Sequence, residues 1–155
     1  MSKRGPGMVH VELTVAAIVA DGPRYLVIEE AISGRYVINQ PAGHVEPGET
    51  IIEAAVRETR EESAWGFVPD GLVGLYYWPH ADGRTTLRVA IAGHVTDHDP
   101  RQALDAPVVA AHWLMRRELA QDYAMRSPLV LRAIDDYERR SPMPLDYLHH
   151  IENAP

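Results

Sequence analysis

The chain has 155 residues, of which 46% are hydrophobic and 24% are charged. That length supports one domain with its own core, and the composition is that of a folded chain rather than a disordered one. The absence of cysteine excludes a disulfide framework, a thiolate metal site and a cysteine nucleophile. A net charge of −7 argues against a broad surface for nucleic acid, so no nucleic acid polymer is expected as a partner.

The beginning of the chain carries no pattern of a targeting segment. Residues 1–8 read MSKRGPGM, and no apolar stretch of the signal-peptide kind follows the two positive charges. The longest apolar run covers only 15–20, far below the roughly 18–20 residues that cross a bilayer. We therefore predict a flexible tail over 1–8, a single domain over 9–151, no membrane partner and a cytoplasmic location.

The first part of the chain favours extended structure. The stretch 9–20 alternates and then becomes continuously apolar, DGPR is a strong turn signal, and 25–31 suits the returning strand of a hairpin. A second turn, SGR, precedes an extended stretch over 36–43. Pro41 disfavours helix before it, and Pro47 with the following glycine makes a turn.

A helix is expected to follow. Thr50 and Glu53 form a T-x-x-E capping box that places its start. Ala64 occupies the position where a glycine would end the helix in a left-handed conformation, and Gly66 could supply that end two residues later. The residues expected to face the core lie on one stripe at helical spacing: Ile52, Ala55, Val56 and Thr59.

The rest of the chain predicts a mixed α/β domain. Ser127 and Pro128 suit the N-cap and first position of the last helix. Strands and helices do not alternate regularly enough for a doubly wound parallel sheet. The elements expected are strands over 71–80 and 85–95, a polar loop over 97–107, a strand over 108–114, and helices over 115–123 and 127–140.

Glu58, Glu61 and Glu62 lie close together near the end of the predicted helix, where they span an arc of roughly 100° on its surface. Like charges at these spacings repel. A solvated face with Arg57 pairing to Glu53 and Glu61 explains part of the pattern. It does not explain Glu58 beside Glu61 and Glu62, because one arginine cannot neutralise three carboxylates. Hard divalent cations such as Mg²⁺ and Mn²⁺ can, since they prefer carboxylate, carbonyl and water oxygens.

This stretch resembles the Nudix box: a glycine, five residues, Glu, seven residues, then Arg-Glu-apolar-x-Glu-Glu-x-Gly-apolar. Three positions depart from the pattern or stretch it, namely Thr59, Ala64 and Trp65, and these affect packing or the helix end. The residues that match in register are Gly43, Glu49, Arg57, Glu58, Glu61 and Glu62. Every acid of the motif is therefore retained.

The resemblance implies an α/β/α sandwich around a mixed sheet and hydrolysis of a phosphoanhydride bond. It implies Mg²⁺ or Mn²⁺ held by Glu58, Glu61, Glu62 and the carbonyl of Gly43, with Arg57 and Glu49 orienting the acids. Glu58, Glu61 and Arg57 are the catalytic residues that it suggests, and which acid serves as base stays open. A further acid from a later loop is also implied, with Asp97, Asp99 and Asp105 as candidates and Asp105 slightly favoured.

Other residues are candidates for contacts with the substrate. Trp78 at a strand end could stack on a base or simply pack. Arg88 either pairs with a buried acid or reaches a phosphate. Asn39 and Gln40 precede the motif glycine and should lie near the cleft. The substrate would be a small phosphoanhydride, and the chain a monomer or homodimer.

A wider similarity extends beyond the motif. The stretches EEAISGRYVINQPAGHVEPGET and RSPLV look like the NudJ-type phosphatase branch, which acts on nucleoside di- and triphosphates and on the pyrimidine pyrophosphate of thiamine synthesis. An alternative is a non-catalytic nucleotide sensor on the same fold, because the motif departs at three positions. An isomerase of isopentenyl-diphosphate type is disfavoured, since that chemistry is associated with a cysteine.

Overall fold

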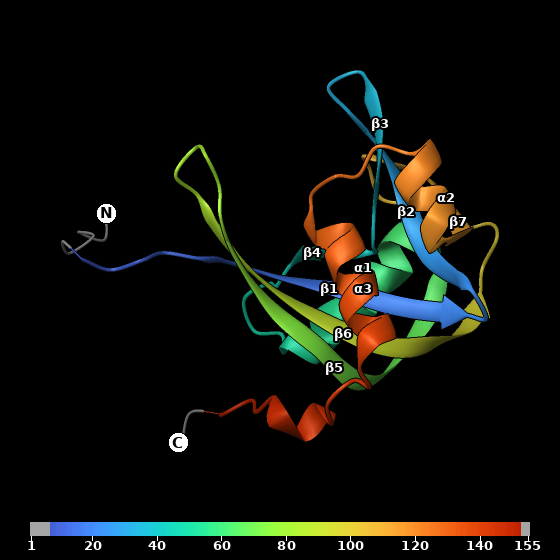
Figure 1. Ribbon diagram of the computed structural model, residues 1–155. Coiled ribbons are helices and arrows are strands. Elements are labelled where there is room, and N and C mark those ends of the chain that lie inside the picture. The colour runs from blue at the N-terminus through green and yellow to red at the C-terminus, as the bar shows by residue number, and fades with distance from the viewer. Residues whose placement is uncertain (1–6, 153–155) are drawn as a thin grey trace.

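The computed structural model describes residues 7–152 and contains a mixed sheet with helices on both sides (Figure 1). The predicted tail lies outside this range over residues 1–6. No helix of the described chain is long and apolar enough to cross a membrane. The elements are β1 Glu12–Asp21, β2 Arg24–Ile32, β3 Arg35–Asn39, β4 Ala42–His44, α1 Ile51–Ser63, β5 Trp65–Pro79, β6 Thr85–His98, β7 Val108–Met115, α2 Arg116–Asp122, α3 Leu129–Arg139 and the 3₁₀ turn η1 Leu145–Tyr147.

The sheet has the order β3-β2-β1-β6-β5, with β4 and β7 attached beside β1 and β2. β1 runs parallel to β6 from the pair Glu12–Thr86 onward, whereas it meets β2 only at its far end, where Ala20 faces Tyr25. Over its first half, β1 pairs instead with the short strand β4. The sheet therefore opens between β1 and β2, and β4 occupies the opening.

Side-chain alternation along β1 separates two cores. Val15 and Val19 belong to a cluster that includes Ala54 and Ala55 of α1. Ile18 belongs to a second cluster, which packs against α2 and α3 on the other face. This arrangement of helix, sheet and helix is the α/β/α sandwich expected from the sequence, and Figure 1 shows α1 and α3 on opposite sides of the strands.

The face that carries α3 changes character along the strands. Where α3 covers it, β6 presents buried Ala90 and Ala92. Closer to the start of β1 and β6, the same face carries Thr14, Thr86 and Arg88. Because polar side chains replace apolar ones where the helix ends, this part of the sheet forms a polar cleft instead of a core.

The predicted helix start is confirmed. The Thr50 hydroxyl accepts a hydrogen bond from the Glu53 N–H at 3.1 Å. The helix ends at Ala64, whose φ is 62°, so the alternative end at Gly66 was wrong. Gly66 lies in β5, where a Cβ would overlap the side chains of β6. Val56 was expected in the core but is 36% exposed, and Ala54 takes its place.

The later strands and helices occur where the sequence places them, with shifted ends. β5 starts six residues before the predicted 71–80, and β6 continues to His98 instead of stopping at 95. The last helix begins at Leu129, and Ser127 still contributes, because its hydroxyl accepts from the Leu129 N–H at 3.2 Å. This end of α3 borders the polar cleft.

Candidate active site

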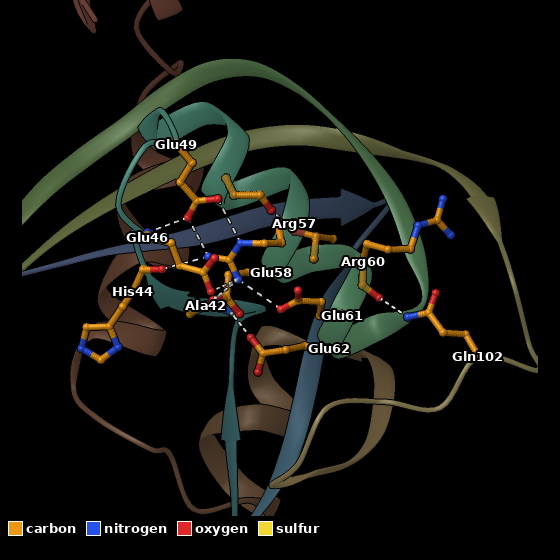
Figure 2. A network of polar contacts seen from close by, with 12 residues as sticks. Ala42, His44, Glu46, Glu49, Arg57, Glu58, Arg60, Glu61, Glu62 and Gln102 are labelled. Atoms are coloured by element: carbon orange, nitrogen blue, oxygen red, sulfur yellow. Dashed lines mark hydrogen bonds and ion pairs between the residues drawn. The ribbon is translucent and has the colours of Figure 1, made fainter.

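Helix α1 carries Glu58, Glu61 and Glu62 next to the side chain of Arg57 and the backbone of Ala42 (Figure 2). Glu62 is 7% exposed, and the side chain of Glu58 is 13% exposed, whereas that of Glu61 is 37% exposed. The helix fixes the spacing of the three carboxylates, and its burial against the sheet fixes their direction. The three acids therefore form a ledge, of which two members are largely removed from water.

Arg57 connects this ledge to the preceding loop. Its Nη1 donates to Glu58 at 2.9 Å and to Glu61 at 3.1 Å. Its Nε and Nη2 hold both oxygens of Glu49 at 3.0 and 2.7 Å. The expected pair with Glu61 is confirmed, but Arg57 has no ion pair with Glu53 within residues 7–152. Glu49 takes that place because the loop folds back over the first turns of α1.

The same contacts fix the loop between β4 and α1. Arg57 Nη2 donates to the His44 carbonyl at 3.0 Å, and Glu49 accepts from the Glu46 N–H at 2.7 Å. The hydrogen bonds from Arg57 hold the pKa of Glu49 below its usual range, and the same bonds raise the pKa of Arg57. The guanidinium thus connects the loop to the helix, as Figure 2 shows.

Residue 43 must be a glycine, because the side chain of Glu58 lies directly against its backbone. A Cβ built at residue 43 would overlap the Glu58 carboxylate. Next to it, the Ala42 N–H donates to Oε1 of Glu62 at 2.8 Å. Strand β4 therefore brings its backbone against two of the acids, and any side chain at residue 43 would push Glu58 away.

Burial dominates the electrostatics of the ledge. Burial, together with the neighbouring carboxylates of Glu58 and Glu30, raises the pKa of Glu62 to about 9, although the hydrogen bond from the Ala42 N–H opposes this. Burial also raises the pKa of Glu58, although Arg57 opposes this. Within residues 7–152, Arg57 is the one guanidinium hydrogen-bonded to the ledge, and Arg88 acts on Glu62 without a hydrogen bond, so the acids outnumber the guanidinium groups that bind them.

The donor set fits a hard divalent cation. The ledge offers carboxylate oxygens beside a backbone carbonyl, which Mg²⁺ and Mn²⁺ prefer. The space at the Gly43 backbone admits the Glu58 carboxylate only because there is no Cβ. Within residues 7–152, no group of three or more His, Asp or Glu side chains is already drawn together as a metal cage. Glu58 and Glu61 are instead held by Arg57.

A cleft of about 450 Å³ opens beside the ledge on the α3 side of the sheet. Arg88 on its floor is buried, which lowers its pKa to about 10, and its Nη1 lies 3.4 Å from Oδ1 of Asn39. The residues lining the cleft are Glu12, Thr14, Glu30, Asn39, Ala42, Gly43, His44, Trp78, His80, Arg84, Thr86, Arg88, Arg126, Ser127 and Leu129.

The cleft brings together three of the four expected substrate contacts: Asn39, Trp78 and Arg88. Gln40 is the exception. It is 1% exposed, and its Nε2 donates to the carbonyl of Val130 at 2.8 Å. This bond ties the segment between β3 and β4 to α3. The geometry therefore indicates a structural role for Gln40 and does not support the predicted contact with substrate.

Thr14 and Glu30 are among the cleft residues that sequence reasoning missed. Thr14 lies within an apolar run and gives little signal of its own. The pairing of β2 with β7 shifts register between Glu29 and Glu30, so simple alternation does not predict the direction of these side chains. A charged residue near the end of an otherwise apolar strand was the available signal for Glu30.

The loop after β6 is attached to the end of α1. Asp97 pairs with Arg60 at 2.7 Å, so its carboxylate is already engaged. The Asp99 N–H donates to the carbonyl of Ala64 at 3.1 Å. The Asp105 N–H donates to the carbonyl of Glu61 at 3.0 Å, which places that residue beside the ledge.

Comparisons with known proteins find relatives of this chain. A family model described as the NUDIX domain matches residues 10–133. The chain is 34% identical over 141 residues to the phosphatase NudJ of Escherichia coli K12, covering 91% of this chain and 92% of that protein. The phosphatase NudJ of Shigella flexneri matches to the same extent.

Solved structures agree with these matches. A NUDIX hydrolase from Nitrosomonas europaea superposes with a TM-score of 0.88 at 40% identity, covering 92% of this chain and 98% of that one. The E. coli ORF135 protein superposes with a TM-score of 0.67 at 28% identity over 89% and 99% of the two chains. Together with the retained acids of α1, these matches show that the chain is a hydrolase of the Nudix family, in its NudJ-like branch.

Proposed function

We propose that this hydrolase is a divalent-metal-dependent pyrophosphohydrolase that cleaves a phosphoanhydride bond of a nucleoside di- or triphosphate or a related small pyrophosphate. The observation that carries the proposal is the buried ledge of Glu58 and Glu62 against the Gly43 backbone, with too little positive charge to balance it. The adjoining cleft carries Arg88 and Arg126, which suit the anionic groups of such a substrate.

Glu58, Glu61, Glu62 and the carbonyl of Gly43 would hold Mg²⁺ or Mn²⁺. The bound cation would draw charge from the bridging phosphate and lower the pKa of a water molecule. Asp105 is the favoured additional acid, because its N–H contacts the Glu61 carbonyl. The exposed position of its side chain leaves it free to reach the same region.

The protein side chains supply orientation and proton transfer. Arg57 keeps Glu58 and Glu61 directed toward the cleft, and Glu49 fixes the plane of its guanidinium through two hydrogen bonds. Either Glu58 or Glu61 accepts the proton of the attacking water, and burial raises the pKa of Glu58, as suits a general base.

The organic part of the substrate would lie farther along the cleft. Trp78 offers an aromatic surface there, and Asn39 offers an amide close to Arg88. The named relatives are phosphatases, which fits a small phosphorylated substrate. We also propose that residues 9–151 act as one catalytic domain in the cytoplasm, as a monomer or homodimer and without a nucleic acid or membrane partner.

A turnover screen tests the proposal. The panel contains nucleoside di- and triphosphates, sugar nucleotides, dinucleoside polyphosphates and thiamine-pathway pyrophosphates, each with Mg²⁺, Mn²⁺ or EDTA. We expect turnover of at least one class with a cation and none with EDTA. Glu58→Gln should abolish it, whereas Glu53→Gln, an exposed acid of the same helix, should not. No turnover of any compound by the wild type would refute the proposal.

A further inference from the structure

Glu30 is a buried acid of the cleft to which the proposed reaction gives no role. It lies near the end of β2 and is 7% exposed. Its Oε2 lies 3.8 Å from Nη1 of Arg126, so that oxygen has a cationic neighbour. Its Oε1 has no hydrogen-bond partner among residues 7–152. A buried carboxylate oxygen in this state loses its hydration without compensation and therefore requires an explanation.

Unpaired polar atoms gather around the same cleft. Five buried side-chain atoms of the described chain lack a partner, and three of them belong to residues that line it: Thr14 Oγ1, Glu30 Oε1 and Arg88 Nε. Asp136, an acid buried elsewhere, accepts hydrogen bonds from several neighbours. The fold thus supplies hydrogen-bond partners to one buried acid, whereas several polar atoms of the cleft lack them.

The unpaired atoms of the cleft have complementary characters. The carboxylate oxygen of Glu30 only accepts, and Nε of Arg88 only donates. A ligand that satisfies both must present a donor and an acceptor close together. An edge of a nitrogen heterocycle does so wherever an N–H adjoins a ring nitrogen or a carbonyl. A phosphate group cannot, because it would repel the carboxylate.

An aromatic surface lies in the same cleft. The rings of Trp78 and His80 are 3.9 Å apart between centroids and inclined by 35°. Beyond Trp78, an apolar groove is lined by Met125, Pro128 and Leu131 among others. A flat heterocycle can stack on such a surface while its edge makes hydrogen bonds, as bases do on aromatic side chains.

We propose that Glu30 is a specificity-determining residue that recognises the organic part of the substrate. Its Oε1 accepts a hydrogen bond from an N–H of a planar heterocycle, Arg88 donates to the neighbouring acceptor, and Trp78 supports the ring. Arg126 engages the other carboxylate oxygen and so positions Glu30. This inference rests on the proposed function, because it assumes that the diphosphate lies at the acids of α1.

The first test compares Glu30→Gln with Glu29→Gln, a matched control on the same strand that lies outside the cleft beside His112. For nucleoside diphosphates, Glu30→Gln should lower kcat/KM by about tenfold or more, mainly through KM. For inorganic triphosphate, which has no organic part, it should change kcat/KM by less than about twofold. Glu29→Gln should leave both substrates within about twofold of wild type.

A second test changes the substrate. The preferred nucleoside diphosphate is compared with its N-methylated analogue, which lacks the N–H, and with its 2′,3′-dideoxy analogue. Wild type should disfavour the methylated analogue by about tenfold or more, and Glu30→Gln should discriminate less, because its neutral amide oxygen is a weaker acceptor than the carboxylate. If the loss in Glu30→Gln disappears with the dideoxy analogue instead, the carboxylate reads ribose hydroxyls and the heterocycle assignment is wrong.

Two further outcomes would overturn the inference. Equal losses for nucleoside diphosphate and inorganic triphosphate would place Glu30 at the reacting end or in the stability of the fold. No loss for either would remove it from recognition altogether.

Calorimetric binding of the nucleoside monophosphate in EDTA separates this inference from the proposed function. A wild type without turnover refutes the proposed function. Unchanged affinity of Glu30→Gln for the monophosphate refutes the inference about Glu30.

Discussion

Helices α1 and α3 each carry a buried acid, and the protein treats the two acids in opposite ways. Asp136 of α3 is 1% exposed and accepts hydrogen bonds from the Tyr76 hydroxyl at 2.8 Å, from Arg132 at 3.0 Å and from Arg139. Burial alone would raise the pKa of Asp136, but the hydrogen bonds from Tyr76, Arg139 and Arg132 together lower it.

Glu62 of α1 has much less support. It accepts one hydrogen bond, from the Ala42 N–H, and its charged neighbours include the carboxylates of Glu58 and Glu30. Burial raises its pKa to about 9. Our proposal accounts for this difference: the protein balances the charge of a structural acid, and it leaves an acid that binds a cation for that cation to balance.

The largest expected effect separates the two acids by activity. Glu62→Gln should lower kcat by about 10³-fold or more, because it removes a charge that the cation requires. Asp136→Asn should change kcat by no more than a few fold, since its partners belong to the core and to α3. Steady-state turnover with Mn²⁺ measures both. Comparable losses of kcat in the two variants would contradict the distinction between a functional Glu62 and a structural Asp136.

Stability should show the reverse order. Asp136→Asn leaves two arginines and a tyrosine without their buried anion, so it should lower the free energy of unfolding by about 2–4 kcal/mol. Glu62→Gln should not lower that free energy in metal-free protein. Urea denaturation followed by fluorescence measures the difference. A Glu62→Gln protein as destabilised as Asp136→Asn would mean that Glu62 is a structural acid.

Arg57 provides a smaller test of how the ledge is oriented. Arg57→Lys keeps the positive charge but loses the planar group that binds both oxygens of Glu49. We expect kcat to fall by about 10- to 100-fold with a small change in stability. Arg60→Lys on the same helix serves as the control, and equal effects of the two changes would deny Arg57 a specific role.

The smallest expected effect concerns pH. Because the folded pKa of Glu62, about 9, lies above its unfolded value, the folded state binds a proton that the unfolded chain releases. In metal-free protein this stabilises the fold at low pH and is lost as pH rises toward 9. Glu62→Gln should therefore be more stable than wild type at pH 8, by about 1–2 kcal/mol. Thermal unfolding between pH 6 and 9 measures this, and parallel curves would contradict it.

The sequence predicted the fold well where local patterns were strong. The cap at Thr50 and the alternation of β1 led to the right elements, because propensity and burial agreed there. The pairing of β4 with β1 was not predictable, since a three-residue strand has no periodicity. That pairing opens the sheet and brings the Gly43 backbone to the ledge.

The site was predicted in its chemistry more than in its details. The spacing of the acids on one helix predicted that they lie together, and the resemblance suggested the roles that we propose for them. Gln40 was misplaced because a residue next to the cleft in sequence can still point into the core. Glu30 was missed because its direction depends on an irregular pairing with β7, which leaves no mark in a single sequence.

Calorimetric titration of metal-free protein with Mn²⁺ at pH 7.5 tests the central claim most directly. If a cation replaces the proton that Glu62 carries in metal-free protein, wild type should release close to one proton as the ion binds. Glu62→Gln should bind the ion at least about tenfold more weakly and without that release. Equal affinity and equal proton release in the two proteins would contradict the account.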